Sequence, residues 1–145
     1  MILFLLLALA AGVLLPVQAG LNAQLRSALG SPIAAAFVSF LVGTAALGGA
    51  TLLFRVSFPV GRAWAVTHPV QWSGGMIGAL YVLAAVVLAP KLGAGTLVAA
   101  VVAGQMVTSL ILDQYGLVGF PIHPVSPLRL LGAVLVIAGV VLIQR

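Results

Sequence analysis

The sequence predicts an all-α integral membrane protein with five transmembrane helices, in a single transmembrane domain of residues 1–145. Of these residues 63% are apolar, and only six Lys or Arg and one acidic residue carry charge. A water-soluble fold could not bury so much apolar surface. Because one helical crossing of a bilayer takes about 20 apolar residues, five crossings would use on the order of 100 residues. The remainder suffices only for short connections, so we expect no separate soluble domain.

The charged residues do not indicate a nucleic-acid partner. The formal net charge is +5, but the basic residues are scattered singly and have no aromatic residues arranged beside them. We interpret them as anchors at the lipid head groups of the bilayer. The sequence contains no cysteine, which excludes disulfides, thiolate metal sites and cysteine nucleophiles.

The first apolar run predicts a helix over residues 2–29. The alternative is a secretory signal peptide, because Val17–Ala19 offers small residues at a possible cleavage site. A signal peptide needs a basic segment before its apolar run, and no residue before Arg26 is positively charged. We therefore expect this helix to be retained.

A second helix is predicted over residues 32–54. Gly30 suits the left-handed conformation that ends a helix, and Ser31 can accept hydrogen bonds from free N–H groups of the next one. Pro32 fits the first helical position. This tight connection predicts an antiparallel hairpin of the first two helices.

The third helix is predicted over residues 70–89, after a loop of residues 55–69. Trp72 lies near its start, where an indole ring favours the membrane interface. We expect the segment Pro90–Gly93 to end the helix, because proline interrupts helical hydrogen bonding.

The last two helices are predicted over residues 95–113 and 127–142. The connection between them, residues 114–126, contains several Gly and Pro residues. Ser126 and Pro127 repeat the Ser-Pro pair that starts the second helix.

Five crossings place the basic residues equally on the two sides of the membrane. Three fall on the side of the N-terminus and three on the other: Arg55, Arg62 and Arg129 against Arg26, Lys91 and Arg145. Because an excess of cytoplasmic Lys and Arg normally sets orientation, an equal distribution predicts that the chain inserts both ways. Two opposed copies could then form an antiparallel dimer, with the symmetry of inverted-repeat transporters. The alternative is that the charges balance by chance. Under simple coin tossing, six charges divide equally about a third of the time, although coin tossing is a looser model than the rule on cytoplasmic Lys and Arg.

Polar residues form one stripe on each of two predicted helices. Their spacing is i, i+4 in both: Gln18, Asn22 and Arg26 in the first helix, and Gln105, Ser109 and Asp113 in the fourth. Polar side chains in a membrane face a cavity or another helix. The stripes therefore predict either a solvated substrate path or hydrogen bonds that join helices.

Pro16 predicts a kink in the first helix. Gly12 lies four residues before it, so the proline ring would crowd the carbonyl of a residue without a side chain. A bend there would free a carbonyl near Gln18, as in the broken helices that line transport sites. The alternative is that proline is simply common in membrane helices.

Asp113 is the only acidic side chain, and it lies near a helix C-terminus, where the macrodipole disfavours negative charge. We therefore expect it to lie next to a cation, and Arg55, Arg62 and Arg129 are predicted on the same side of the membrane. Asp113 then has either a structural role, in an ion pair, or a role in proton coupling.

The sequence lacks the groups that an enzyme or a metal site requires. His68 and His123 have no neighbouring ligands at metal spacing. No Ser-His-Asp set and no close pair of carboxylates is available for an intramembrane enzyme. We therefore expect no enzyme activity, no metal and no cofactor.

Small residues at helical spacing predict close helix packing. They form four pairs: Gly74 with Gly78, Gly75 with Ala79, Ser39 with Gly43, and Gly132 with Gly139. The last pair lies in the most uniformly apolar helix, residues 127–142, which is a candidate dimer contact.

Taken together, several motifs are typical of one family. They are the string Pro16–Arg26, then Gly30–Pro32, Ala36, Ser39–Phe40, Gly43–Thr44, Gly74–Gly75, Gly78, Tyr81, Pro90–Gly93, Gly104–Gln105, Asp113, Gly116, Arg129 and Gly132. In order and spacing, over nearly the whole chain, this set resembles the YdcZ-type five-helix family of the drug/metabolite transporter superfamily.

The resemblance implies a half-size, multi-pass protein of the bacterial inner membrane, with a drug/metabolite-transporter-like fold. It also implies an antiparallel pair, with an inverted copy of the chain or with a sister chain, but no particular substrate. Four-helix relatives exchange protons for cations through a glutamate in the first helix, and this chain has no glutamate. That route of antiport is therefore in doubt.

We hypothesise a small-molecule transporter with a central polar cavity and alternating access. Its predicted lining is Gln18, Asn22, Ser39, Gln105 and Ser109, with Tyr81 or Trp72 stacking on the substrate. Amides both donate and accept hydrogen bonds, so this lining suits a neutral, zwitterionic or aromatic solute. The alternative is a non-transporting membrane subunit that stabilises or regulates a partner, in which the polar stripes only join helices.

Overall fold

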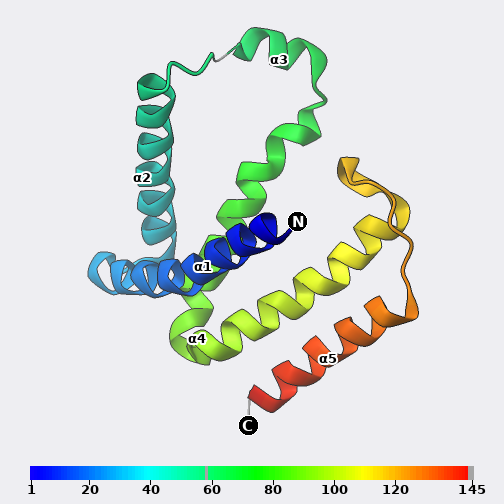
Figure 1. Cartoon of the computed structure of the whole chain (residues 1–145). Coiled ribbons are helices and arrows are strands. Elements are labelled where there is room, and N and C mark those ends of the chain that lie inside the picture. Colours follow the sequence, from blue (N-terminus) through cyan, green and yellow to red (C-terminus); the bar gives the residue numbers. More distant parts are fainter. Residues whose placement is uncertain (58, 144–145) are drawn as a thin grey trace. The chain divides into compact units, whose positions relative to one another are not determined.

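The computed structural model describes residues 1–57 and 59–143, and within these ranges every regular element is a helix. The elements in chain order are α1 (Ile2–Leu29), α2 (Pro32–Leu53), α3 (Val60–Val66), η1 (Pro69–Ser73), α4 (Gly74–Tyr115), η2 (Leu117–Gly119) and α5 (Pro127–Ile143) (Figure 1). The chain divides into two compact units, Met1–Pro90 and Lys91–Arg145. We describe each unit by itself.

The connection between α1 and α2 consists of Gly30 and Ser31, and their types, with that of Pro32 at the start of α2, determine its geometry. Gly30 adopts the left-handed conformation (φ 70°), and its N–H donates to the carbonyl of Arg26. The hydroxyl of Ser31 accepts a hydrogen bond from the N–H of Ala34 at 3.3 Å, and Pro32 is the first residue of α2. The helix ends are thus satisfied locally, and the chain changes direction within two residues. The two helices cross at a wide angle (Figure 1), so the predicted antiparallel hairpin is wrong.

The core of the first unit lies where α1, α2 and the first part of α4 meet. It consists of small and branched side chains: Ala35 and Ala36 of α2 with Val82 and Val86 of α4, flanked by Leu25 and Leu83. Val86 and Ala35 are completely buried. The helices α2 and α4 lie close together at Gly78, where an added Cβ would be in ordinary van der Waals contact with the ring of Phe40, at 3.6 Å.

The segment between α2 and α4 is more ordered than the predicted loop of residues 55–69. It contains the two-turn helix α3 and the 3₁₀ helix η1, so that α4 begins at Gly74 and not at the predicted residue 70. His68 caps η1, because its side chain accepts from the N–H of Val70 while its own N–H donates to the side chain of Gln71. A seven-residue helix has too few turns to produce a recognisable apolar period, and its glycine and the prolines around it indicated a loop.

The helix α4 continues past Pro90 and breaks within the segment Pro90–Gly93, where the sequence predicted an end. Its single residue of non-helical backbone is Gly93 (φ 75°, ψ 163°). The break therefore lies three residues later than the proline, at the residue without a side chain. It separates two helical segments, residues 74–92 and 94–115, each about 20 residues long and so about as long as one membrane crossing.

The second unit joins the end of α4 to the start of α5 through residues 116–126. The N–H of His123 donates to the carbonyl of Asp113 at 2.8 Å, and the N–H of Val125 donates to the side chain of Gln114 at 2.7 Å. Gly116 makes this turn possible: its φ is +61°, and a Cβ there would lie 2.7 Å from Cγ1 of Ile122. The connection is thus held by specific hydrogen bonds.

Most large apolar side chains are not covered by the chain itself. Three helices are long and apolar enough to cross a membrane, namely Ile2–Leu29, Pro32–Leu53 and the combined run Pro69–Tyr115. At most 17% of the apolar window in any of them is buried, and α5 is a further apolar helix of 17 residues. An apolar surface of this extent fits a lipid environment.

Candidate functional site

A small polar recess in the first unit brings together three of the residues predicted to bind substrate. Gln18 and Asn22 of α1 and Tyr81 of α4 line it, together with apolar side chains of the same two helices. Its volume is about 10 Å³, which is close to the space that one water molecule needs. In this conformation the recess therefore holds polar groups but has no room for a solute.

Asn22 is the buried polar residue among those described, with 6% of its surface exposed. Its side-chain amide forms no hydrogen bond with the described residues, yet none of its polar atoms is fully enclosed. The amide therefore faces the recess with its donors and acceptor unused. Because these atoms keep some access to the recess, a water molecule, a ligand or a second chain can supply their hydrogen bonds.

Gln18 and Tyr81 lie beside Asn22 at the rim of the recess. Gln18 is exposed, and Tyr81 is 36% exposed in the single chain. Gln18 precedes Asn22 by one helical turn, so the i, i+4 spacing puts both amides on the same face of α1. An aromatic ring and two amides thus surround one point between α1 and α4.

Arg26 extends the same face of α1 by another turn and contacts α4. Its Nη1 donates to the carbonyl oxygen of Val86 at 3.3 Å. In a regular helix this carbonyl accepts from the N–H four residues later, but residue 90 is a proline and has no N–H. Arg26 therefore supplies the hydrogen bond that Pro90 removes, which explains how α4 continues past its proline.

The other predicted lining residues do not join the recess. Ser39 is half-buried on α2, and Trp72 lies in η1, where its Nε1 donates to the hydroxyl of Thr67 at 2.8 Å. The rings of Trp72 and Trp64 are 5.2 Å apart. Trp72 thus belongs to an aromatic pair in the connection between α2 and α4, where an interfacial role suits it.

Gln105 and Ser109 belong to the second unit. Gln105 is exposed, whereas the hydroxyl of Ser109 donates to the carbonyl of Met106 at 2.9 Å. Of the stripe on the second part of α4, only the amide of Gln105 is therefore available to a ligand. The helix α1 is continuous from Ile2 to Leu29, with Pro16 inside it. The bend predicted at Gly12 and Pro16 stays a prediction.

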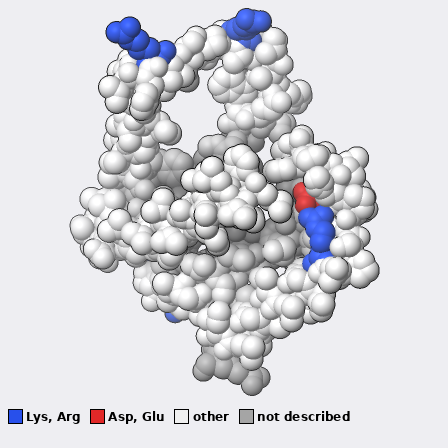
Figure 2. Space-filling model, in the orientation of Figure 1, with Lys and Arg blue, Asp and Glu red and all other residues white. Residues whose placement is uncertain are grey.

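Asp113, the third residue of that stripe, forms an ion pair with Arg129 at the start of α5. Figure 2 shows the acidic side chain directly against basic atoms. Arg129 also donates to the carbonyl of His123 at 2.9 Å, so it joins both sides of the connection. Of the three arginines considered as partners, the structure selects the nearest in sequence, and a role of Asp113 in proton coupling stays untested.

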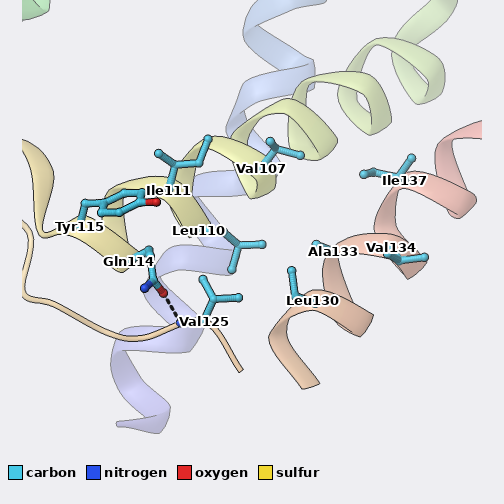
Figure 3. A pocket seen from close by; sticks show the side chains of 10 residues that line it. All are labelled: Val107, Leu110, Ile111, Gln114, Tyr115, Val125, Leu130, Ala133, Val134 and Ile137. Atoms are coloured by element: carbon cyan, nitrogen blue, oxygen red, sulfur yellow. Dashed lines mark hydrogen bonds between the residues drawn. The ribbon is translucent and has the colours of Figure 1, made fainter. Parts of the chain in front are cut away.

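Next to this ion pair lies an apolar cleft of about 400 Å³ between the end of α4 and α5 (Figure 3). Its walls are mostly Val, Leu and Ile side chains, and the oxygen of Gln114 that points towards it is already bonded to Val125. A second apolar cleft, of about 360 Å³, lies between α2 and α4 in the first unit. The second cleft is lined by apolar side chains alone, and the first has only Gln114 and Tyr115 as polar lining residues, so both suit apolar groups better than a polar solute.

The described residues contain no group of three or more His, Cys, Asp or Glu side chains that could hold a metal ion. His68 serves as a helix cap, and His123 belongs to the connection between α4 and α5. Both histidines therefore have local structural roles in this part of the chain.

Comparison with known proteins identifies one family. Residues 3–142 match the family described as "Putative inner membrane exporter, YdcZ". No curated protein and no solved structure matches the chain.

Proposed function

The chain belongs to the YdcZ family, and from this membership we propose that it is one half of an exporter that carries a small solute across the inner membrane. The observation that carries the proposal is Asn22, a residue 6% exposed that lines the recess and has no side-chain hydrogen bond to another described residue. Unpaired polar groups inside membrane helices are costly and are retained mainly where they serve a function. The family description favours a transporter over the non-transporting subunit considered from the sequence.

The proposed topology has five crossings, made by α1, α2, the two segments of α4, and α5. At 17 residues α5 is at the short end of the length that spans a bilayer. With five crossings the basic residues divide equally between the two sides, although Arg145 lies outside the described residues. This balance supports insertion in both orientations.

Two inverted copies would complete a chamber that one copy leaves unfinished. The recess of about 10 Å³ cannot hold a solute, so the second copy must supply the opposing wall. We place Gln18, Asn22 and Tyr81 at its centre, with Ser39, Gln105 and Ser109 as further candidates for the lining. Rocking of one copy against the other would then expose the chamber to each side in turn.

The glycines of α5 support this helix as a contact between copies. Within the second unit no atom lies within 4 Å of a Cβ added at Gly132 or Gly139. Stripes of small residues let membrane helices approach closely, and these two are unused inside their own unit. Gly78, by contrast, already packs on Phe40 within one chain.

The absence of cysteine from the sequence allows a direct test of topology. Val56→Cys and Ser27→Cys place single thiols at exposed positions that five crossings put on opposite sides of the membrane. With a membrane-impermeant maleimide applied to intact cells, we expect about half of the molecules of each variant to react. Complete labelling of one variant and none of the other would refute dual insertion.

Transport itself is tested in proteoliposomes loaded with a mixture of zwitterionic, anionic and neutral metabolites, with export quantified by mass spectrometry. We expect Asn22→Ala to abolish export while crosslinked dimers persist. Gln24→Ala is the matched control, because it removes an exposed amide elsewhere on α1. Equal export by both variants, or the loss of dimers with Asn22→Ala, would support the alternative in which the polar side chains only join helices.

A further inference from the structure

Arg26 is a cation that has no anionic partner among the described residues. The sequence has a single acidic side chain, Asp113, and Arg129 already forms an ion pair with it. Arg26 is partly buried, and its partner among the described residues is the backbone carbonyl of Val86. A carbonyl accepts a hydrogen bond but does not neutralise the charge.

The contact with Val86 holds the guanidinium against α4, one helical turn of α1 beyond Asn22 of the recess. The backbone of Val86 lies in the core, where its side chain is completely buried. Arg26 is one helical turn, about 6 Å along the axis, from Asn22. The missing N–H of Pro90 thus gives Arg26 a fixed position on α4, instead of leaving it to extend freely towards water.

The free donors of Arg26 suit an oxyanion. A guanidinium has five N–H donors in a planar fork, and the described contact uses one of them. Such a fork binds a carboxylate or phosphate through two parallel hydrogen bonds, which a partly desolvated site strengthens. Because the guanidinium is partly buried against α4, an anion that pairs with it would stabilise the protein.

We propose that Arg26 binds the oxyanion of the transported solute, while Asn22 and Tyr81 bind its remainder. This inference rests on the proposed function and names its substrate class: small solutes with a carboxylate group, anionic or zwitterionic. The same chemistry could be supplied by the phosphate of a lipid head group, and the experiment distinguishes the two sources.

The test measures thermal unfolding of the full chain in a phosphate-free maltoside detergent. The probes are benzoate and glycine at millimolar concentration, with benzamide and glycinamide as the matched solutes without a carboxylate, and phosphatidylglycerol as the lipid. We expect at least one carboxylate to raise the Tm by about 2–4 °C and its amide to have no effect. The increase should disappear in Arg26→Gln and remain in Arg62→Gln, which removes an exposed arginine of α3.

Arg26→Gln also removes the hydrogen bond to Val86, so it could unfold for that reason alone. Pro90→Ala restores the helical N–H for the Val86 carbonyl, and the double variant should therefore fold and still fail to respond to carboxylates. Recovery of the response in the double variant would show that Arg26 only replaces the proline's hydrogen bond. Stabilisation by phosphatidylglycerol alone, or by none of the probes, would also overturn the proposal.

The two proposals can fail independently. Carboxylate binding that depends on Arg26, without export from proteoliposomes, would keep the site and refute the transporter. Export of neutral solutes that is unchanged in the Arg26→Gln/Pro90→Ala variant would keep the transporter and refute the oxyanion site.

Discussion

The two units contain stripes of the same spacing but of opposite chemistry. In the first unit, Asn22 is buried without a hydrogen-bond partner and Arg26 lacks an anion. In the second unit, Ser109 bonds within its own helix and Asp113 is paired with Arg129. The i, i+4 pattern alone thus does not distinguish a binding site from a structural contact. What distinguishes them is whether the chain satisfies its own polar groups.

The largest expected effect separates the two stripes in transport. Asn22→Ala should lower export about 5- to 150-fold, because a hydrogen bond to a substrate inside a desolvated site is worth about 1–3 kcal/mol. Ser109→Ala should lower it less than twofold, since its hydroxyl is already bonded to Met106. Both rates would be measured in the same proteoliposome assay. Similar losses in the two variants would show that both stripes face the substrate.

The same comparison reverses when stability is measured. Asp113→Asn leaves Arg129 without its partner, and we expect a loss of about 2 kcal/mol, between the values for exposed and buried ion pairs. Export should stay near that of the wild type. The double variant Asp113→Asn/Arg129→Gln should lose less stability than the sum of the single changes, because the two residues interact. Unfolding by denaturant in detergent measures all three, and strict additivity would contradict a direct pair.

Local signals predicted the helix ends, because the residues involved satisfy one another within a few positions. Gly30, Ser31 and Pro32 act as their residue types indicate. The short helix α3 was not predicted, because seven residues show no clear apolar period. The segment Pro90–Gly93 predicted a break in the helix, and the break lies at its last residue, Gly93. The hydrogen bond from Arg26 to Val86, which is 60 residues away in sequence, could not be inferred from the neighbours of the proline.

The site was predictable to a similar degree. Spacing placed Gln18 and Asn22 on one helix face, and the structure adds Tyr81 to them in one recess. Trp72 was proposed as a stacking ring because it is aromatic. In the structure its indole donates to Thr67, in the connection between α2 and α4. The sequence could not identify the partner of Asp113, because it placed three arginines on the same side of the membrane. The choice of Arg129 depends on how residues 116–126 fold.

A smaller effect tests how strictly the connection in the second unit is built. Gly116→Ala should destabilise the protein by about 1.5 kcal/mol, because a side chain with a positive φ is strained. The added Cβ would also lie 2.7 Å from Ile122. Gly119→Ala has the same type of strain (φ +84°) without a neighbour within 4 Å, so it should cost less. Equal losses in the unfolding assay would mean that the contact with Ile122 relaxes freely.

The smallest effect compares the two Ser-Pro helix starts, which are nearly identical in geometry. Ser31 accepts from the N–H of Ala34 and Ser126 from that of Arg129, both at 3.3 Å. Replacing either serine by alanine should cost about 1 kcal/mol, the usual value of such a cap. The residue that donates to Ser126 also forms the ion pair with Asp113, so Ser126→Ala should loosen that pair and cost slightly more. A larger loss with Ser31→Ala would instead place the more tightly coupled polar network in the first unit. The contrast between a stripe with hydrogen-bond partners and a stripe without them would then no longer match the two units.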